Sequence, residues 1–275
     1  MNAIGLVSPG EMGAAIGARL VERGERVRWA SDGRGSATAA RAQRAGVEDA
    51  GTLGELASGC QLLLSVVPPQ FARRVAQDAA AAGFRGLYVD ANAIAPSTAT
   101  TVRAVVEQAG AQYVDGGIIG PPPGPSPTRL YLSGELAEQV AARLRSPLIE
   151  TSVVAGGPAA ASALKLAYAA WTKGSAALLL AAAALARRQG VADALSAEWQ
   201  HSQPGLGGRL QRAARSAVEK GWRWAPEMEE IAVTMERSGL PSGFPAAAAD
   251  LFRRSHRDAD PADLGALLDA LTGER

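Results

Sequence analysis

The sequence is poor in the residues that build disulfide frameworks and metal centres. Its 275 residues include one cysteine, Cys60, and two histidines. A lone cysteine excludes an internal disulfide, and so few cysteines and histidines leave no cluster of the kind that binds zinc. We therefore expect a site without a metal ion.

The chain also lacks an excess of charge of either sign. It carries 28 lysines and arginines against 27 aspartates and glutamates, which gives a formal net charge of +1. Proteins that bind a nucleic-acid backbone usually show a clear basic excess. We therefore expect a small-molecule substrate, and no nucleic acid, as the partner.

Long hydrophobic runs are scarce as well. The N-terminus has no cationic leader, and its apolar segment is broken at Ser8-Pro9-Gly10, so it is too short for a signal peptide. The longest apolar run, residues 176–186, is about half of the roughly 20 residues that a membrane-spanning helix needs. These features predict a cytoplasmic protein with no membrane partner.

What the first half does contain is an alternation of short apolar runs and helical stretches. Near-continuous apolar strands separated by helices are typical of a parallel sheet covered on both faces. The predicted fold class is therefore α/β, with an N-terminal Rossmann-type, doubly wound sheet. Strands are predicted at 3–7, 26–30, 61–67, 87–90, 112–115, 129–132 and 149–154, with helices at 12–23, 71–82 and 98–108.

From residue 159 onward the pattern is helical. Residues 159–189 hold no proline and a single glycine, Gly174, which predicts one long interdomain helix that ends at Gly190. Breaks in the later helices are predicted at 204–205, at Pro226 and at 239–241. We therefore divide the chain into a Rossmann-type α/β domain, residues 1–155, and an all-α domain, residues 156–275.

The turn after the first predicted strand is the first candidate site. It reads Ser8-Pro9-Gly10-Glu11-Met12-Gly13, a G-x-G-x-x-G pattern in which Ser8 replaces the first glycine. Placed between a strand and a helix, this pattern is typical of dinucleotide binding, because the helix N-terminus offers free N–H groups to the pyrophosphate. The alternative is an ordinary turn. We predict that Ser8, Pro9, Gly10, Glu11 and Met12 contact the cofactor.

The end of the second predicted strand distinguishes the two nicotinamide cofactors. A carboxylate there binds the ribose hydroxyls of NAD, whereas cations and hydroxyls bind the 2′-phosphate of NADP. The segment offers Arg34 with Ser31 and Ser36 for a phosphate, while Asp32 favours NAD. We predict NADP, with NAD as the alternative.

Five segments, taken in order, resemble the motifs of the β-hydroxyacid dehydrogenase family, which includes 6-phosphogluconate and 3-hydroxyisobutyrate dehydrogenases. The resemblance covers essentially the whole chain and looks like a less characterised branch. It implies that Val67 and Pro68 pass the cofactor ribose, that Asn92 lies near the nicotinamide, and that the catalytic lysine is Lys165. The segments are IGLVSPGEMG at 4–13, SVVP at 65–68, DANAIAP at 90–96, DGGIIGP at 115–121 and GGPAAASALK at 156–165.

The sequence departs from the family where the substrate is bound. By resemblance, Ile119, Gly120 and Pro121 occupy the substrate motif, yet Ile119 stands where the family has a serine. Ala169 replaces an asparagine that follows the lysine, and Glu229, beside Glu230, stands where the family has a second lysine. Three contacts to an anionic substrate are therefore lost or reversed, and Glu229 or Glu230 would instead select a neutral or cationic substrate.

Lys165 and Tyr168 are the predicted catalytic residues. Lys165 lies among Ala163, Leu164 and Leu166, and a lysine in so apolar a setting tends to be desolvated, which lowers its pKa. Such a lysine can protonate the oxygen formed when hydride reaches a carbonyl. The alternative is a lysine that extends from a helix edge into water. Tyr168, at i+3, is the candidate hydrogen-bond partner in place of the missing asparagine.

Three functions remain open at this point. The leading one is an NADP-dependent oxidoreductase acting on a small carbonyl or alcohol, with Lys165 as general acid/base. An imine reductase is related in fold and suits Glu229 and Glu230, but that group usually has another residue at the lysine position. The third is a non-catalytic NADP-binding sensor.

The long predicted helix also bears on assembly. Residues 159–189 would span about 45 Å at 1.5 Å per residue, too long for the remaining residues to cover. Its apolar middle, around Leu178 and Leu185, therefore predicts an intertwined homodimer, as in the family that the chain resembles.

Overall fold

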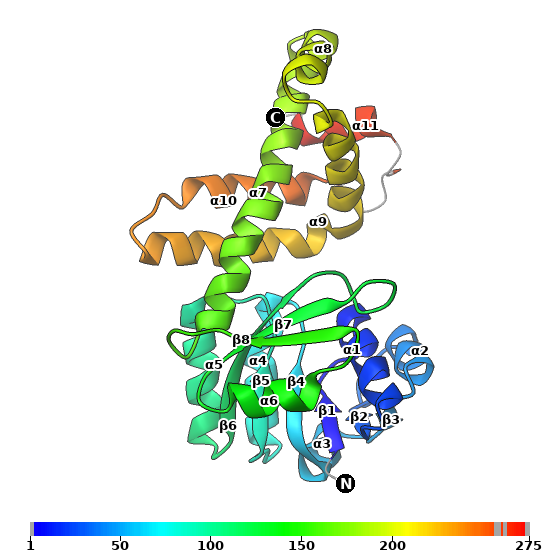
Figure 1. The fold of residues 1–275 in the computed structure, drawn as a ribbon, viewed down its shortest axis with the longest axis vertical. Helices are drawn as coiled ribbons and strands as arrows, with labels where there is room; N and C mark the ends of the chain where they lie inside the picture. The colour runs from blue at the N-terminus through cyan, green and yellow to red at the C-terminus, as the bar shows by residue number, and fades with distance from the viewer. Residues whose placement is uncertain (1–2, 256–259, 261–262, 273–275) are drawn as a thin grey trace. The chain divides into compact units, whose positions relative to one another are not determined.

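The computed structural model describes residues 3–255, 260 and 263–272, and it divides the chain into two compact units (Figure 1). The first unit, Met1–Lys165, is α/β, and the second, Leu166–Arg275, is helical in its described residues. This confirms the predicted fold class. The predicted domain boundary at residue 155 lies in the loop between the last strand and the long helix. The separate roles assigned to the two domains stay predictions.

Eight strands form one sheet in the described part of the first unit. Their order is β3-β2-β1-β4-β5-β6-β7-β8, and neighbouring strands from β3 to β6 are parallel. β7 is antiparallel to β6, so the fully parallel sheet expected from the sequence is wrong at this pair. The connection between them, residues 120–127, is shorter than the crossover that parallel neighbours require. The strands are β1 (Ala3–Leu6), β2 (Val27–Trp29), β3 (Glu48–Asp49), β4 (Cys60–Ser65), β5 (Leu87–Asp90), β6 (Gln112–Ile119), β7 (Thr128–Ser133) and β8 (Ile149–Val153).

Helices cover both faces of this sheet (Figure 1). Leu62 and Leu64 of β4 belong to one buried cluster, whereas Leu63 between them belongs to the other. Successive side chains of a strand point to opposite faces, so β4 contributes to two cores, as expected for a doubly wound sheet. The helices are α1 (Glu11–Glu22), α2 (Ser36–Arg44), α3 (Leu53–Gly59), α4 (Ala72–Ala81) after the 3-10 turn η1 (Pro69–Phe71), α5 (Pro96–Gln108) and α6 (Ala137–Leu144).

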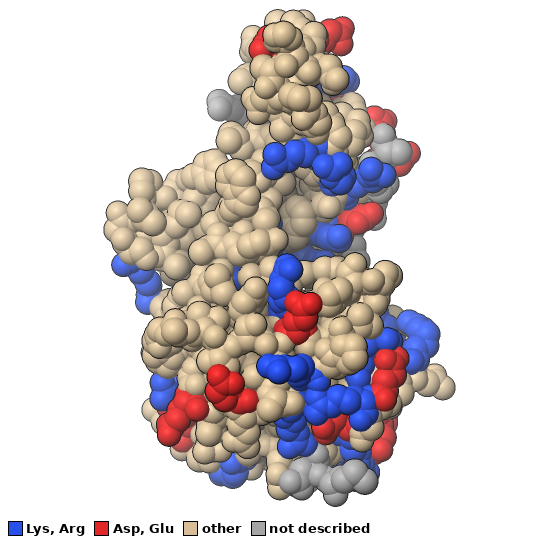
Figure 2. Space-filling view, viewed as in Figure 1, with Lys and Arg blue, Asp and Glu red and all other residues tan. Residues whose placement is uncertain are grey.

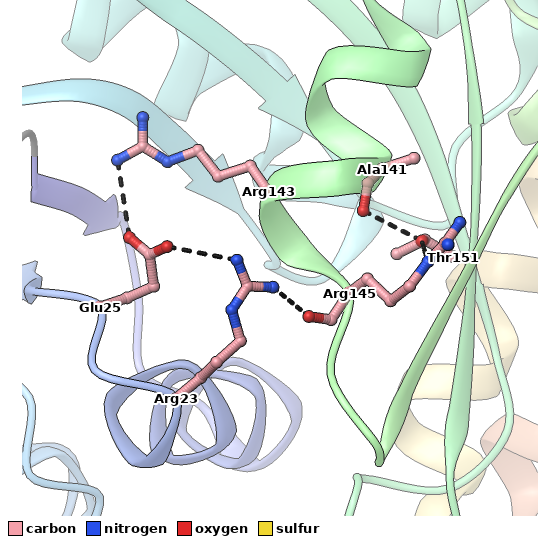
Figure 3. A network of polar contacts seen from close by, with 6 residues as sticks. All are labelled: Arg23, Glu25, Ala141, Arg143, Arg145 and Thr151. Atoms are coloured by element: carbon pink, nitrogen blue, oxygen red, sulfur yellow. Dashed lines mark hydrogen bonds and ion pairs between the residues drawn. The ribbon is translucent and has the colours of Figure 1, made fainter.

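A chain of polar contacts ties the turn after α1 to the end of α6 (Figure 3). Glu25 accepts a hydrogen bond from Arg23 at 3.4 Å and pairs with Arg143 at 3.7 Å. Arg23 also donates to the backbone carbonyl of Arg145. Arg145 donates to the Thr151 hydroxyl at 3.1 Å, which links the network to β8. These contacts join segments from the two ends of the first unit.

The second unit is built on two long helices, α7 (Ala160–Arg188), which starts in the first unit, and α9 (Leu206–Arg237). α7 confirms the long helix predicted at 159–189. The predicted break at Pro226 is wrong, because α9 runs through it. Ala225 and Met228 beside the proline are buried, and this packing offsets the hydrogen bond that a helical proline loses. The remaining helices are α8 (Ala192–Ser202), α10 (Gly243–Arg254) and α11 (Leu264–Thr272).

By length and composition, α7 is apolar enough to cross a membrane. Its most apolar 18-residue window has a mean hydropathy of 1.4, although the strictly apolar run 176–186 is shorter. Within the protein 44% of that window is buried. A core helix of a soluble protein passes the same test, so a single helix of this kind is weak evidence for a membrane span.

Candidate functional site

The glycine-rich turn joins β1 to α1 at the carboxyl edge of the sheet. A Cβ on Gly13 would lie 2.6 Å from the backbone oxygen of Ser8, so a glycine is required where the turn folds back on itself. Gly10 is the N-cap of α1, and Pro9 is buried beside it. β1 lies between β2 and β4, which is the switch point at which open α/β sheets bind their ligands.

The N-terminus of α1 fits a pyrophosphate. Its N-cap residue, Gly10, has no side chain that could occupy the space in front of the first turn. A Cβ built on Gly10 would meet no described atom within 4 Å. The positive end of the helix dipole and the open space above Gly10 together suit a phosphate group.

Two arginines lie over this turn. Arg34, in the loop after β2, approaches the carbonyl of Val7 at 3.5 Å. Arg41, on α2, donates to the carbonyl of Pro9 at 3.3 Å and to the Thr38 hydroxyl at 3.2 Å. Sequence reasoning selected Arg34 but not Arg41, although the helical spacing of Arg41 from the loop was visible. Both guanidinium groups therefore hydrogen-bond to backbone carbonyls at the start of the glycine-rich turn.

Two of the three hydroxyl and acidic groups expected near Arg34 are exposed. Ser36 opens α2 and Asp32 is exposed in the same loop. Ser31 instead hydrogen-bonds Asp49, and this bond together with the N–H of Gly51 lowers the pKa of Asp49. The Ser31 hydroxyl is thus engaged within the protein.

Asn92 ties the ends of β4 and β5 together. Its Oδ1 accepts the N–H of Val67 at 2.6 Å, and its Nδ2 donates to the Ser65 hydroxyl at 3.1 Å. Val67 and Pro68, the residues predicted to pass the cofactor ribose, follow β4 directly. The Asn92 side chain therefore fixes the backbone of that segment, a contact that the sequence did not reveal.

Asp90, at the end of β5, hydrogen-bonds to the backbone of Asn92. Its Oδ1 accepts the N–H of Asn92 at 3.0 Å, and its Oδ2 has no hydrogen-bond partner among the described residues. Burial, with a smaller contribution from the nearby Asp115, raises the pKa of Asp90 to about 7 against the lowering effect of its hydrogen bonds with Asn92. A buried acid of this kind is shared between its neutral and ionised forms near neutral pH.

Lys165 lies against β6, the strand next to β5. A Cβ on Gly117 would lie 2.6 Å from the carbonyl oxygen of Ala161 and 2.9 Å from the Cβ of Lys165. The bare backbone of Gly117 therefore allows the first turns of α7 to approach the strand closely. Since β4, β5 and β6 are adjacent and parallel, Lys165 belongs to the same edge of the sheet as the dinucleotide turn.

The three residues of the predicted substrate motif differ in their exposure to solvent. Ile119, at the end of β6, is buried, with 4% of its surface exposed. Gly120 and Pro121, which follow it, are exposed, and Gly120 has a φ of +126°. Gly120 thereby allows the chain to turn sharply after β6.

The remaining predicted residues lie in the helical unit. Tyr168, three residues after Lys165 on α7, is 45% exposed. Glu229 forms an ion pair with Arg253 on α10. Glu230 accepts the hydroxyl of Thr234 through its backbone carbonyl at 2.8 Å.

The helical unit also holds a buried ion pair that the sequence did not indicate. Lys173 of α7 pairs with Glu227 of α9, with side-chain exposures of 10% and 13%. The Lys173 ammonium also lies 5.9 Å from the ring centre of Trp224. Sequence spacing alone cannot pair two residues that lie 54 positions apart.

The sheet order and the glycine turn at the N-terminus of α1 are those of a dinucleotide-binding protein. Residues 3–144 match the family described as the NAD binding domain of 6-phosphogluconate dehydrogenase, and the chain belongs to this family. Residues 186–255 match a domain of unknown function, DUF1932. The protein is therefore an NAD(P)-dependent oxidoreductase, as the sequence motifs predicted.

Solved structures agree over nearly the full length. A conserved hypothetical protein from Sinorhizobium meliloti is 26% identical, with a TM-score of 0.71, and 98% of this chain and 96% of that chain are covered. The 3-hydroxyisobutyrate dehydrogenase of Mycobacterium tuberculosis, solved with L-serine, is 19% identical with a TM-score of 0.74 over 99% and 100% of the chains.

A reductive aminase from Aspergillus terreus, solved with NADPH and ethyl levulinate, is 22% identical with a TM-score of 0.59 over 98% and 99%. At such identities the two enzymes show the fold alone. A search of curated proteins gave no match.

Proposed function

We propose that the protein is an NADP-dependent oxidoreductase that transfers hydride between the nicotinamide and a small carbonyl or alcohol, with Lys165 as general acid/base. The observation that carries this proposal is the close approach of Lys165 to Gly117 at the same sheet edge as the dinucleotide turn. Bound NADPH would supply the hydride, and the protein would orient the partners and move the proton.

Arg34 and Arg41 support the choice of NADP. Each reaches the backbone of the glycine turn, at Val7 and Pro9 respectively. A guanidinium group binds a phosphate through two parallel hydrogen bonds, and charged hydrogen bonds are about twice as strong as neutral ones. Ser36, at the start of α2, adds a hydroxyl on the same side. These groups match a 2′-phosphate better than a ribose diol.

The cofactor assignment is tested by titration with NADPH and NADH. Arg34→Ala and Arg41→Ala should each weaken NADPH binding by about 10- to 100-fold, the equivalent of one lost charged hydrogen bond, and leave NADH binding unchanged. Arg44→Ala, an exposed residue at the end of the same helix as Arg41, is the matched control. Equal loss for both cofactors would contradict the assignment.

Lys165 supports the proton step. It lies one turn into α7 and is half-buried against β6. In the reductive direction its ammonium would give a proton to the substrate oxygen, and in the oxidative direction its amine would take one. Tyr168, at i+3 on the same helix, is proposed as the hydrogen-bond partner of the reacting oxygen.

The substrate is proposed to be small and not strongly anionic. Ile119 offers an apolar side chain where the related family has a serine hydroxyl, and Glu229, beside Glu230, stands where that family has a lysine. These differences favour a neutral or cationic substrate. They also support the second candidate, an imine reductase, whose class is represented among the similar folds by the reductive aminase.

A substrate panel distinguishes these functions. We would follow NADPH oxidation with cyclohexanone, with cyclohexanone plus allyl amine, and with a small aldehyde. The reverse reaction would be followed with L-serine and 3-hydroxyisobutyrate. Turnover of the carbonyl or alcohol compounds supports the first proposal, and turnover only with amine present supports the imine reductase. Tight NADPH binding without any turnover would favour the sensor.

We also propose an intertwined homodimer. Trp171, Leu178 and Leu185 follow each other at seven-residue intervals on α7 and are 68%, 58% and 62% exposed. Figure 2 shows a largely uncharged surface over this part of the helical unit. Covering the exposed part of three such side chains stabilises an interface by roughly 3–6 kcal/mol. Leu178→Glu should yield a monomer in analytical ultracentrifugation, whereas a wild-type monomer at micromolar concentration would refute the dimer.

The compartment is proposed to be the cytoplasm. Cys60 is buried at 7% exposure, and burial raises the pKa of its thiol. A neutral, buried thiol suits a reducing compartment. Fractionation of cells that express the protein, followed by immunodetection, tests the assignment.

A further inference from the structure

The sheet supplies hydrogen-bond acceptors for the first turn of α7. The N–H of Ala161 donates to the Ser133 hydroxyl at 3.0 Å, and the N–H of Ser162 donates to Asp115 Oδ2 at 2.8 Å. The first-turn N–H groups of a helix need such acceptors. Here they come from β7 and β6, which lie 28 and 47 residues away along the sequence.

Asp115 is the centre of this cap. Its Oδ1 accepts the hydroxyl of Ser162 at 2.5 Å, and its Oδ2 also accepts the hydroxyl of Ser133 at 3.0 Å. Asp115 and Ser133 are direct cross-strand partners in the antiparallel pair of β6 and β7. Both are buried, at 0% and 1% exposure. Burial raises the pKa of Asp115, and the hydrogen bonds from Ser162 and Ser133 oppose that rise.

The same strand then contacts Lys165. Gly117 lies two residues after Asp115, so both face the same side of β6. Lys165 lies four residues after Ala161, so both lie on one face of α7. Asp115 holds the first turn of the helix, and Gly117 allows the second turn to reach the strand. Together they fix the position of Lys165 along β6 and its distance from that strand.

We propose that Asp115, acting with Ser133 and Ser162, is a positioning residue for Lys165, and this inference rests on the proposed function. By resemblance, the segment 115–121 is a substrate motif. Its first residue, Asp115, is instead buried and accepts hydrogen bonds from the first turn of α7. Its carboxylate also faces the positive end of the helix dipole, one turn from the lysine, and favours the ammonium form there.

The composition of the chain allows a direct test. Lys165, Lys173 and Lys220 are its only lysines. In protein labelled with carbon-13 at lysine Cε, NMR should give three signals. The signal that is absent from Lys165→Met belongs to Lys165. Each signal follows the titration of its own ammonium group. The titration is read above pH 8, where Asp90, with a pKa of about 7, is already ionised.

Asp115→Asn should lower the titration midpoint of Lys165 by about half a pH unit and leave those of Lys173 and Lys220 in place. Ser162→Ala removes one hydroxyl and keeps the backbone N–H, so it should lower the Lys165 midpoint by a smaller amount. This second variant provides the test if Asp115→Asn does not fold. Asp78→Asn, a surface carboxylate paired with Arg74, is the control for loss of charge.

Activity assays on the same proteins distinguish the positioning role of Asp115 from the catalytic role of Lys165. We expect Asp115→Asn to lower kcat about tenfold with little change in the KM for NADPH. An unchanged Lys165 midpoint in both variants overturns the positioning role, even if Lys165→Met is inactive. A Lys165→Met protein as active as the wild type overturns the proposed function, and the positioning role with it.

Discussion

Gly117 offers a substitution whose effect can be worked out from distances. In Gly117→Ala the new methyl group would lie 2.6 Å from the carbonyl oxygen of Ala161 and 2.9 Å from the Cβ of Lys165. Ordinary contact begins near 3.4 Å. The obstructing atom at Ala161 is backbone, so rotation of a side chain cannot relieve the overlap, and α7 must move away from β6 by about 0.8 Å.

This displacement has two separable consequences. Overpacking of this size lowers the free energy of unfolding by about 1–3 kcal/mol. Because Lys165 moves with the helix, the rate of proton transfer should also fall, and a displacement near 1 Å can cost about 100-fold. The dinucleotide turn lies on other strands, so we expect NADPH affinity to be retained.

The assay combines urea unfolding, NADPH titration and single-turnover kinetics. Gly157→Ala is the matched control, since a Cβ at that position, just before α7, meets no described atom within 4 Å. It should behave like the wild type in all three measurements. If Gly117→Ala loses stability and yet turns over at the wild-type rate, the geometry at Lys165 does not limit the reaction and the reasoning is refuted.

Three further predictions concern stability. Glu227→Gln leaves Lys173 buried without its partner and should cost about 3–5 kcal/mol in urea unfolding, whereas a cost below 1 kcal/mol would mean that water reaches the pair. Asp90 has its pKa raised from 3.8 to about 7, so the folded state holds its proton more tightly than the unfolded state. The free energy of unfolding should therefore fall as pH rises from about 4 to about 7, by up to roughly 4 kcal/mol. Asp90→Asn should flatten this dependence, and an unchanged slope between pH 5 and pH 8 would contradict it. Glu25→Ala breaks the half-exposed network with Arg23 and Arg143 and should cost less than about 1 kcal/mol, so a cost above 2 kcal/mol would show that the network is more deeply buried than its exposures indicate.

The parts of the fold that sequence patterns predicted are those with strong apolar periodicity. β1, β4, β5 and α7 are largely apolar segments, and their observed bounds differ from the predicted ones by two residues at most. α2 and β3 were missed. α2 reads SATAARAQR and buries a single residue, Ala42, and β3 is two exposed acidic residues. Such elements are held by tertiary contacts that leave little trace in local sequence.

The candidate site shows the same division. The glycine turn and Lys165 stand in motifs that are contiguous in sequence and were found there. The cap on α7 joins Asp115, Ser133 and Ser162 from three elements, and the Lys173–Glu227 pair joins two distant helices. Neither follows from spacing along the chain. The β6–β7 hairpin likewise depends on the register Asp115↔Ser133, which the Pro-rich loop between the strands does not reveal.

The central claim is that Lys165 moves the proton that accompanies hydride transfer. It is tested most directly by single-turnover NADPH oxidation with the best substrate of the panel, comparing Lys165→Met with Lys220→Met. Proton transfer by a positioned side chain contributes about 100- to 10,000-fold. We expect a loss of that size in Lys165→Met, with NADPH affinity retained and Lys220→Met at the wild-type rate. Equal rates in the two variants would contradict it.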